Sequence, residues 1–174
     1  DMVAEHMHAQ VCSIYLYDEK SEEIILKATR GLNPSSVNNL RMNINEGLCG
    51  MSLRDEIVIC EKSGSENPNF KYFPGSDEEK FEVILAVPIT RGKVKIGVLV
   101  VQRERDFYFS DQDVMAMKAT ASQLASMLDN VRLLLSPQSV SEDTRPRIDF
   151  ASYRFIRGKS ASGSFAMGPS AVAK

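Results

Sequence analysis

The stretch Phe109-Ser110-Asp111-Gln112-Asp113 opens a long amphipathic segment that ends near Leu135, directly after a predicted strand pair at 83–102. Ser110 is a favourable N-cap, and the acidic residues that follow it suit the positive end of a helix dipole. The spacing therefore predicts a helix with one buried face. Its apolar residues recur in steps of three and four, as on one face of an α-helix: Val114, Met117, Ala121, Leu124, Leu128, Val131 and Leu135.

The composition is that of an ordinary globular protein. Of the 174 residues, 43% are hydrophobic, which fits one domain with some extra material. The formal net charge of -2 is scattered along the chain and gives no polybasic surface, so we expect no binding to nucleic acid. No apolar run approaches the ~20 residues that a membrane span needs, and the chain begins without the features of a signal peptide. We therefore expect no membrane contact, and the beginning is typical of a domain taken from a longer protein.

The cysteine and histidine patterns bear on location and metal binding. Three cysteines are an odd number, which argues against a disulfide scaffold and favours a cytoplasmic protein. Cys12 and Cys60 lie in strand-like segments, where we expect them to be small buried hydrophobic side chains. His6 and His8 lie two positions apart on a predicted helix, a spacing that does not place them on one face. We expect neither a metal site nor a bound cofactor.

Alternating apolar and polar residues predict an antiparallel sheet. The alternation is regular from Val11 to Tyr17 and from Glu23 to Thr29, with a turn between the two segments. Pro88 lacks an amide donor, which in a central strand predicts a bulge or a position next to an opening. Further strands are expected at 41–44, 83–90 and 94–102, and a short helix at 35–40.

A polar segment from Ser63 to Lys80, called the aromatic loop below, carries Phe70, Tyr72 and Phe73. Its prolines and Gly75 are turn formers, so the segment is expected to be a loop. Apolar groups in a loop have one of two roles. They cap the exposed edge of the core, or they form a lid over a cavity beside the sheet.

The composition changes after Leu135. Residues 136–157 begin with small, charged and proline residues that cannot build a core, which is typical of a linker. Residues 158–174 are rich in small residues and look like the start of another domain. We therefore expect one domain at 1–135, a linker, and a truncated domain start.

The order of the expected elements resembles that of a GAF domain, a small-molecule sensor module, over residues 1–135. Three motifs carry the resemblance: the turn into a helix at Glu46-Gly47-Leu48-Cys49-Gly50, and the strands Ala86-Val87-Pro88-Ile89 and Gly97-Val98-Leu99. The resemblance implies an α+β fold with an antiparallel sheet. Terminal helices would pack on one face of this sheet, and a ligand-pocket loop and short helices on the other.

Within the family, Asn67 to Pro74 and His6 to Asp18 are most similar to the N-terminal GAF domain of the nitrogen-related phosphotransferase-system Enzyme I. Gly158 to Pro169 looks like the start of the phosphohistidine domain of Enzyme I, with Gly163-Ser164-Phe165 in place of Pro-Gly-Ile. The resemblance implies a regulatory domain that senses a metabolite. It would control phosphoenolpyruvate-dependent autophosphorylation by domains absent from this chain. Glutamine and 2-oxoglutarate are associated with nitrogen signalling in that family, and glutamine is the leading ligand candidate.

The resemblance also implies a ligand pocket beside the sheet, concave and mostly apolar. Two polar side chains, Asn67 and Glu79, together with the Tyr72 hydroxyl, would orient an amino-acid ligand. The alternative is that the aromatic residues merely close the core and the pocket is vestigial. The expected walls are Leu48, Cys49, Phe70, Tyr72, Phe73, Phe81, Ile84 and Pro88.

An enzymatic alternative comes from another GAF group, the free methionine-R-sulfoxide reductases. Cys49 in its glycine-containing turn and Cys60 resemble two cysteines of that group. The attacking cysteine of those enzymes belongs in the aromatic loop, where residues 70–75 contain none. Without a thiolate to attack the sulfoxide sulfur, the chemistry lacks its first step, so we expect no catalysis by this chain.

The apolar face of the C-terminal helix also permits association with a second helix. Ala116, Ala119 and Ala125 allow close approach of two helices. A helix packed on its own sheet would show a similar pattern. We expect a parallel homodimer through the terminal helices, which is compatible with sensing.

Overall fold

The computed structural model describes residues 2–105 and 108–135. The linker expected at 136–157 and the domain start expected at 158–174 lie outside the described residues. The same holds for the side chains of Met2, Val3, Glu79 and residues 129–135.

A six-stranded antiparallel sheet, in the strand order β3-β2-β1-β6-β5-β4, forms the centre of the fold. The five strands expected with stated bounds are present within one residue of their expected ends, and the strand-like segment around Cys60 is β4 at the edge of the sheet. The strands are β1 (Val11–Asp18), β2 (Glu23–Arg30), β3 (Arg41–Asn43), β4 (Ile59–Glu61), β5 (Val83–Arg91) and β6 (Val94–Arg103).

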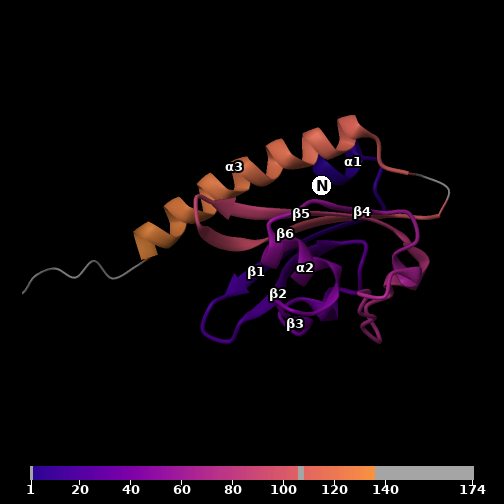
Figure 1. Cartoon of the computed structure of the whole chain (residues 1–174), viewed down its shortest axis with the longest axis horizontal. Helices are drawn as coiled ribbons and strands as arrows, with labels where there is room; N and C mark the ends of the chain where they lie inside the picture. Colours follow the sequence, from indigo (N-terminus) through magenta and orange to yellow (C-terminus); the bar gives the residue numbers. More distant parts are fainter. Residues whose placement is uncertain (1, 106–107, 136–174) are drawn as a thin grey trace, which may run out of the picture. The chain divides into compact units, whose positions relative to one another are not determined.

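Helices cover both faces of this sheet. The helices α1 and α3 lie on one side and α2 on the other, which confirms the predicted α+β class and layer order (Figure 1). Within the described residues, no helix combines the length and the apolar character that crossing a bilayer requires. The described helices are α1 (Met2–His6), α2 (Gly47–Asp55) and α3 (Asp111–Leu135), with the 3-10 helices η1 (Pro34–Ser36), η2 (Gly64–Glu66) and η3 (Glu78–Lys80).

The short helix expected at 35–40 is limited to η1. Beyond Ser36 the chain turns back to β2, where the Asn38 N–H donates to the Leu26 carbonyl (2.8 Å) and the Leu26 N–H donates to the Leu40 carbonyl (3.0 Å). The Asn38 N–H therefore bonds to the sheet instead of to a carbonyl of the preceding turn, although the N–H groups of Asn39 and Leu40 still donate to the Ser36 carbonyl.

The strands β5 and β6 are covered on both faces, so their side chains supply two cores. Leu85 belongs to the core that Met117 and Ala121 of α3 complete. Its neighbour Ile84 belongs to the other core, together with Leu48 of α2. Successive side chains of a strand point to opposite faces, which explains this division. Each fully buried apolar side chain of this size contributes about 1.5–3 kcal/mol, so both layers are held to the sheet by burial.

Arg103, the last residue of β6, joins both terminal helices to the sheet. Its guanidinium donates to the Met7 carbonyl beyond α1 and to the Tyr108 carbonyl (2.8 Å). It also lies 3.5 Å from Asp113 Oδ1 and 4.2 Å from the centroid of the Phe109 ring. The guanidinium therefore fixes the end of α1 and the start of α3 at one point.

Pro88 lies beyond the end of β4. Strand β4 pairs with β5 from Ile84 to Ala86, whereas Pro88 has Val98 of β6 as its partner. The irregularity in β5 occurs one step later, between Ile89 and Thr90. The proline therefore occupies a stretch of β5 that β4 does not cover, a position that tolerates a missing amide donor.

The prediction that Cys60 is buried is wrong. It lies on β4, a three-residue edge strand in which Ile59 is buried and Cys60 is exposed. An edge strand has a neighbouring strand on one side only, so part of its surface stays in contact with solvent. Cys12, on the interior strand β1, is half-buried.

The predicted start of α3 is confirmed. The Ser110 N–H donates to Asp113 Oδ2 (2.8 Å), and the Asp113 N–H donates to Ser110 Oγ (3.2 Å). These reciprocal bonds have the arrangement of a capping box. The predicted apolar face packs on the sheet at Met117 and Ala121, and its last two residues lie outside the described side chains.

We predict that Ser110→Ala lowers the free energy of unfolding by about 1 kcal/mol, because the Asp113 N–H loses its acceptor. Circular dichroism should show a melting temperature lower by a few degrees. Ser122→Ala, at an exposed position inside α3, is the control and should leave the melting temperature unchanged or higher, since alanine favours helix. Equal losses in the two variants would contradict the capping role.

Candidate functional site

Two glycines bring α2 close to its neighbours. Gly47 has a φ of +68°, and a Cβ there would lie 3.3 Å from the Lys71 Cβ. A Cβ on Gly50 would lie 2.6 Å from the carbonyl oxygen of Ile44. Larger residues at these two positions would push α2 outward. The glycine-containing turn noted in the sequence therefore holds Leu48 in the core below the aromatic loop.

Hydrogen bonds give the aromatic loop a defined path. The Gly64 N–H donates to the Glu82 carbonyl (2.7 Å), which ties the start of the loop to the segment that leads into β5. The Phe73 N–H donates to Glu78 Oε1 (3.1 Å). The first bond thus holds the beginning of the loop next to β5. The second bond joins two residues within the second half of the loop.

An ion pair holds the loop to α2. The Lys71 ammonium bonds to the carboxylate of Glu46, the N-cap residue of α2, and lies 5.4 Å from the centroid of the Phe73 ring. The hydrogen bond from Lys71 lowers the pKa of Glu46, so the pair is charged at neutral pH. The loop therefore lies across the first turn of the helix.

The aromatic residues have both of the roles considered for them. Phe70, Phe73 and Phe81 are partly buried and pack on the core at the α2 side of the sheet. Tyr72 keeps 43% of its surface exposed. Cavities remain beside these rings, so the aromatic residues close the core and also line open space.

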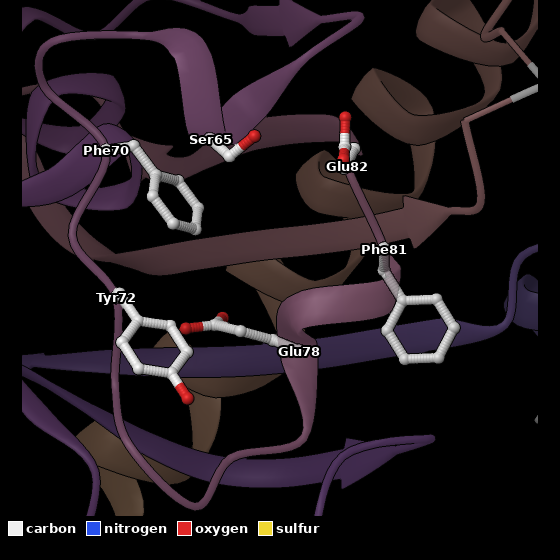
Figure 2. Close-up of a pocket in the computed structure, with 6 residues that line it drawn as sticks. All are labelled: Ser65, Phe70, Tyr72, Glu78, Phe81 and Glu82. Atoms are coloured by element: carbon white, nitrogen blue, oxygen red, sulfur yellow. The ribbon is translucent and has the colours of Figure 1, made fainter.

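The larger cavity has a volume of about 300 Å³. Phe70 and Tyr72 come to it from the aromatic loop, and Glu78 comes from η3 with its carboxylate pointing toward the Tyr72 ring (Figure 2). Its six lining residues are Ser65, Phe70, Tyr72, Glu78, Phe81 and Glu82.

The smaller cavity lies between α2, the loop and the sheet. Its volume of about 30 Å³ leaves room for little more than a water molecule. Phe70 and Glu78 border both cavities. The lining consists of Tyr15, Met42, Gly47, Leu48, Cys49, Phe70, Lys71, Phe73, Glu78, Ile84, Val100 and Gln102.

Most of the expected wall residues come together at these two cavities. Phe70, Tyr72 and Phe81 line the larger one, and Leu48, Cys49, Phe70, Phe73 and Ile84 line the smaller one.

Two expected residues lie elsewhere, and a third is not described. Asn67 lines neither cavity, because its Nδ2 donates to Glu61 Oε1 (2.9 Å) and its Oδ1 accepts from the Asn69 N–H (2.9 Å). Pro88 also lines neither cavity. The Glu79 side chain lies outside the described residues.

Sequence reasoning missed the polar residues of the larger cavity. Glu82 carried a usable signal, because it lies two positions before Ile84 in the segment that enters β5, and residues two apart on a strand share a face. Glu78 lies in a run of three acidic residues, and the sequence does not indicate which of them points inward. Ser65 carried no signal.

The cysteines lack the character of attacking thiols. Burial raises the pKa of Cys49 to about 12, and the charge of Glu78 adds to this effect. Burial also raises the pKa of Cys12 and of Cys60. Catalytic cysteines have lowered pKa values, because the thiolate is the nucleophile. All three thiols are therefore protonated at neutral pH, which does not fit a sulfoxide reductase.

We predict that Cys60 is the first thiol to react when the folded protein is treated with an aromatic disulfide reagent at pH 8, because Cys60 is exposed. Cys60→Ser should remove the fast phase, and denaturant should release the remaining thiols. Cys49 should react slowly at both pH 8 and pH 9, because its pKa of about 12 leaves very little thiolate at either pH. Rapid labelling of Cys49 in the folded Cys60→Ser variant, identified by peptide mass spectrometry, would contradict this assignment.

Comparison with known proteins agrees with the architecture. A family model described as the GAF domain matches residues 2–129. A phosphoenolpyruvate-dependent phosphotransferase system protein of Escherichia coli (strain K12) is 32% identical over 127 residues, which make up 73% of this chain and 17% of that protein. The chain thus spans less than a fifth of the length of this curated relative.

Two solved structures have the same fold. The GAF domain of a phosphoenolpyruvate-protein phosphotransferase from Acinetobacter has 30% sequence identity and a TM-score of 0.68, covering 76% of this chain and 78% of that one. The corresponding domain from Coxiella burnetii has 29% identity and a TM-score of 0.72, covering 76% and 79%. Sequence and structure therefore lead to the same family.

Proposed function

Because the chain belongs to the GAF domain family, we propose that it is the metabolite-sensing domain of a phosphoenolpyruvate-protein phosphotransferase. The observation that carries the proposal is the cavity of about 300 Å³ beside the aromatic loop. This volume is at the lower end of the range for small-molecule sites, and its walls combine apolar rings with a few polar groups. The ligand is a small polar metabolite, with glutamine as the leading candidate.

The arrangement of the two cavities supports a ligand that changes the loop. Phe70 and Glu78 border both cavities, and we propose that a rotation of the Phe70 side chain joins the two spaces. A ligand that entered the joined space would reach Val100 and Gln102 on β6. The opposite face of β6 carries α3, so a ligand-induced change in the sheet has a direct route to this helix.

The proposed output is control of phosphoenolpyruvate-dependent autophosphorylation, carried out by other parts of the parent protein in nitrogen signalling. The relatives are phosphotransferase-system proteins, which supports this output. In the proposal, this chain is the sensing domain of such a protein. Helix α3 leads from the sheet toward residues 136–174, which makes it the structural link to whatever follows in the chain.

We predict that glutamine at a hundredfold excess over its Kd raises the free energy of unfolding by ~2.7 kcal/mol, seen as a melting temperature higher by several degrees. Tyr72→Ala removes one wall of the larger cavity and should abolish the shift. The unliganded protein should lose little stability, because 43% of the Tyr72 surface is already exposed. Differential scanning fluorimetry measures both effects.

Tyr108→Ala is the matched control, since it removes an exposed tyrosine that lines neither cavity. It should retain the full glutamine shift. A screen of amino acids, 2-oxo acids and nucleotides that produces no shift would rule out sensing. The aromatic residues would then serve to close the core of a vestigial pocket.

We also propose a homodimer through the terminal helices. The inner face of α3 is occupied by its own sheet at Met117, Ala121 and Ala125. A partner helix must therefore use the outward part of α3, where Met115 is 70% and Met127 is 64% exposed. Large apolar side chains exposed on a helix favour contact with another apolar surface.

We predict that light scattering at micromolar concentration gives twice the chain mass of 19.4 kDa. Met127→Glu should shift the protein toward the monomer, because it places a charge in the apolar contact. Lys93→Glu, at the exposed turn between β5 and β6, is the control and should remain dimeric. A monomeric mass for the unaltered chain would contradict the proposal.

A further inference from the structure

Apart from Ser65, the larger cavity is lined by residues of two kinds, and both kinds attract positive charge. Aromatic rings attract cations through the negative faces of their π-systems, and carboxylates attract them directly. None of the described lining residues is a lysine, arginine or histidine. The three rings are those of Phe70, Tyr72 and Phe81, and the two carboxylates are those of Glu78 and Glu82.

Glu78 supplies a buried negative charge. Glu78 is buried, and its Oε1 accepts the hydrogen bond from the Phe73 N–H (3.1 Å). After burial, the charge of Glu78 is a further cause of the raised pKa of both Tyr15 and Cys49, which line the smaller cavity. Glu78 also lines the larger cavity, so a cation there would lie close to its carboxylate.

Glu82 supplies a second charge that is only loosely engaged. Its Oε2 lies 3.2 Å from Arg105 Nε. Arg105 also lies 3.1 Å from Glu66 Oε1, and its side chain is 61% exposed. The pair is therefore open to solvent on the Arg105 side, where the Glu82 side chain itself is 27% exposed, and solvent screens part of the attraction. A cation that approached Glu82 from the cavity would replace Arg105 at small cost, since Arg105 would retain Glu66.

We infer that the larger cavity binds an organic ammonium ion between its aromatic rings and the Glu78 and Glu82 carboxylates. The inference rests on the proposed sensing function and names the chemical group that the site recognises. In an amino acid such as glutamine this group is the α-ammonium. Dianionic 2-oxo acids carry no positive group, and the charge of the walls repels them. The volume of about 300 Å³ suits a small amine rather than a bare metal ion.

The test compares cations with neutral molecules of the same shape. Choline is paired with 3,3-dimethylbutan-1-ol, and n-butylammonium with 1-butanol, in isothermal titrations of the full chain. Each cation should bind at least about tenfold more tightly than its neutral partner, because only the cation gains the ring and carboxylate attraction. Equal affinities within both pairs would overturn the inference.

Three variants locate the effect. Glu82→Gln keeps the shape of the wall and should weaken choline binding by about tenfold. Arg105→Gln should strengthen it severalfold, because the competing guanidinium is removed. Glu104→Gln makes the same charge change at an exposed position outside the cavity and should have no effect. Melting temperatures without ligand verify that each variant is folded.

The outcomes separate this inference from the proposed function. If glutamine stabilises the protein but the cations do not bind, and Glu82→Gln leaves the glutamine shift unchanged, the sensor proposal stands and the ammonium site is wrong. If neither glutamine nor any cation binds, both are wrong. If Glu82→Gln weakens choline binding and Arg105→Gln strengthens it, the ammonium site is supported. Were the Glu82–Arg105 pair merely structural, both variants would be expected to weaken binding.

Discussion

The burial of β5 and β6 on both faces is the constraint on which the rest of the structure depends. A sheet covered on one side would need alternating polarity, but these strands are apolar along nearly their whole length because each face supports its own layer. One layer is formed by α1 and α3, and the other by α2 and the aromatic loop. Neighbouring residues of β6 serve different layers. Gln102 borders the smaller cavity, and Arg103 bonds to the chain at the end of α1 and before the start of α3.

This constraint explains which parts of the fold could be predicted from sequence. The start of α3 depends on Ser110 and Asp113, three residues apart, and its buried face on a spacing that repeats within each turn. The prediction of the hairpins depends on the alternation of apolar and polar residues within single strands. Such signals are local, and the elements they indicated are present with nearly the expected bounds. Cys60 was misjudged because its exposure depends on where the sheet ends, which is a property of the whole sheet.

The candidate site could be predicted in part only. Phe70, Tyr72 and Phe73 stood out because large rings are unusual in a polar segment, and each of them lines a cavity. The path of the loop depends on bonds between distant residues, such as that of the Asn33 N–H to the Ser76 carbonyl (3.1 Å). Sequence patterns do not reveal such pairs. For this reason the sequence could not show that Glu78 and Glu82 line the same cavity, although the spacing of Glu82 from Ile84 indicates the face on which Glu82 lies.

The sharing of Arg105 between Glu66 and Glu82 ties the chemistry of the cavity to the position of the connection between β6 and α3. A displacement of the Arg105 side chain away from Glu82 would leave the cavity more negative. By thermodynamic linkage, an occupant of the cavity changes the free energy of displacing Arg105 by as much as the displacement changes the affinity for that occupant. A partner that binds more tightly when Arg105 is displaced from Glu82 would then act as an effector of the cavity, with no contact to the ligand itself.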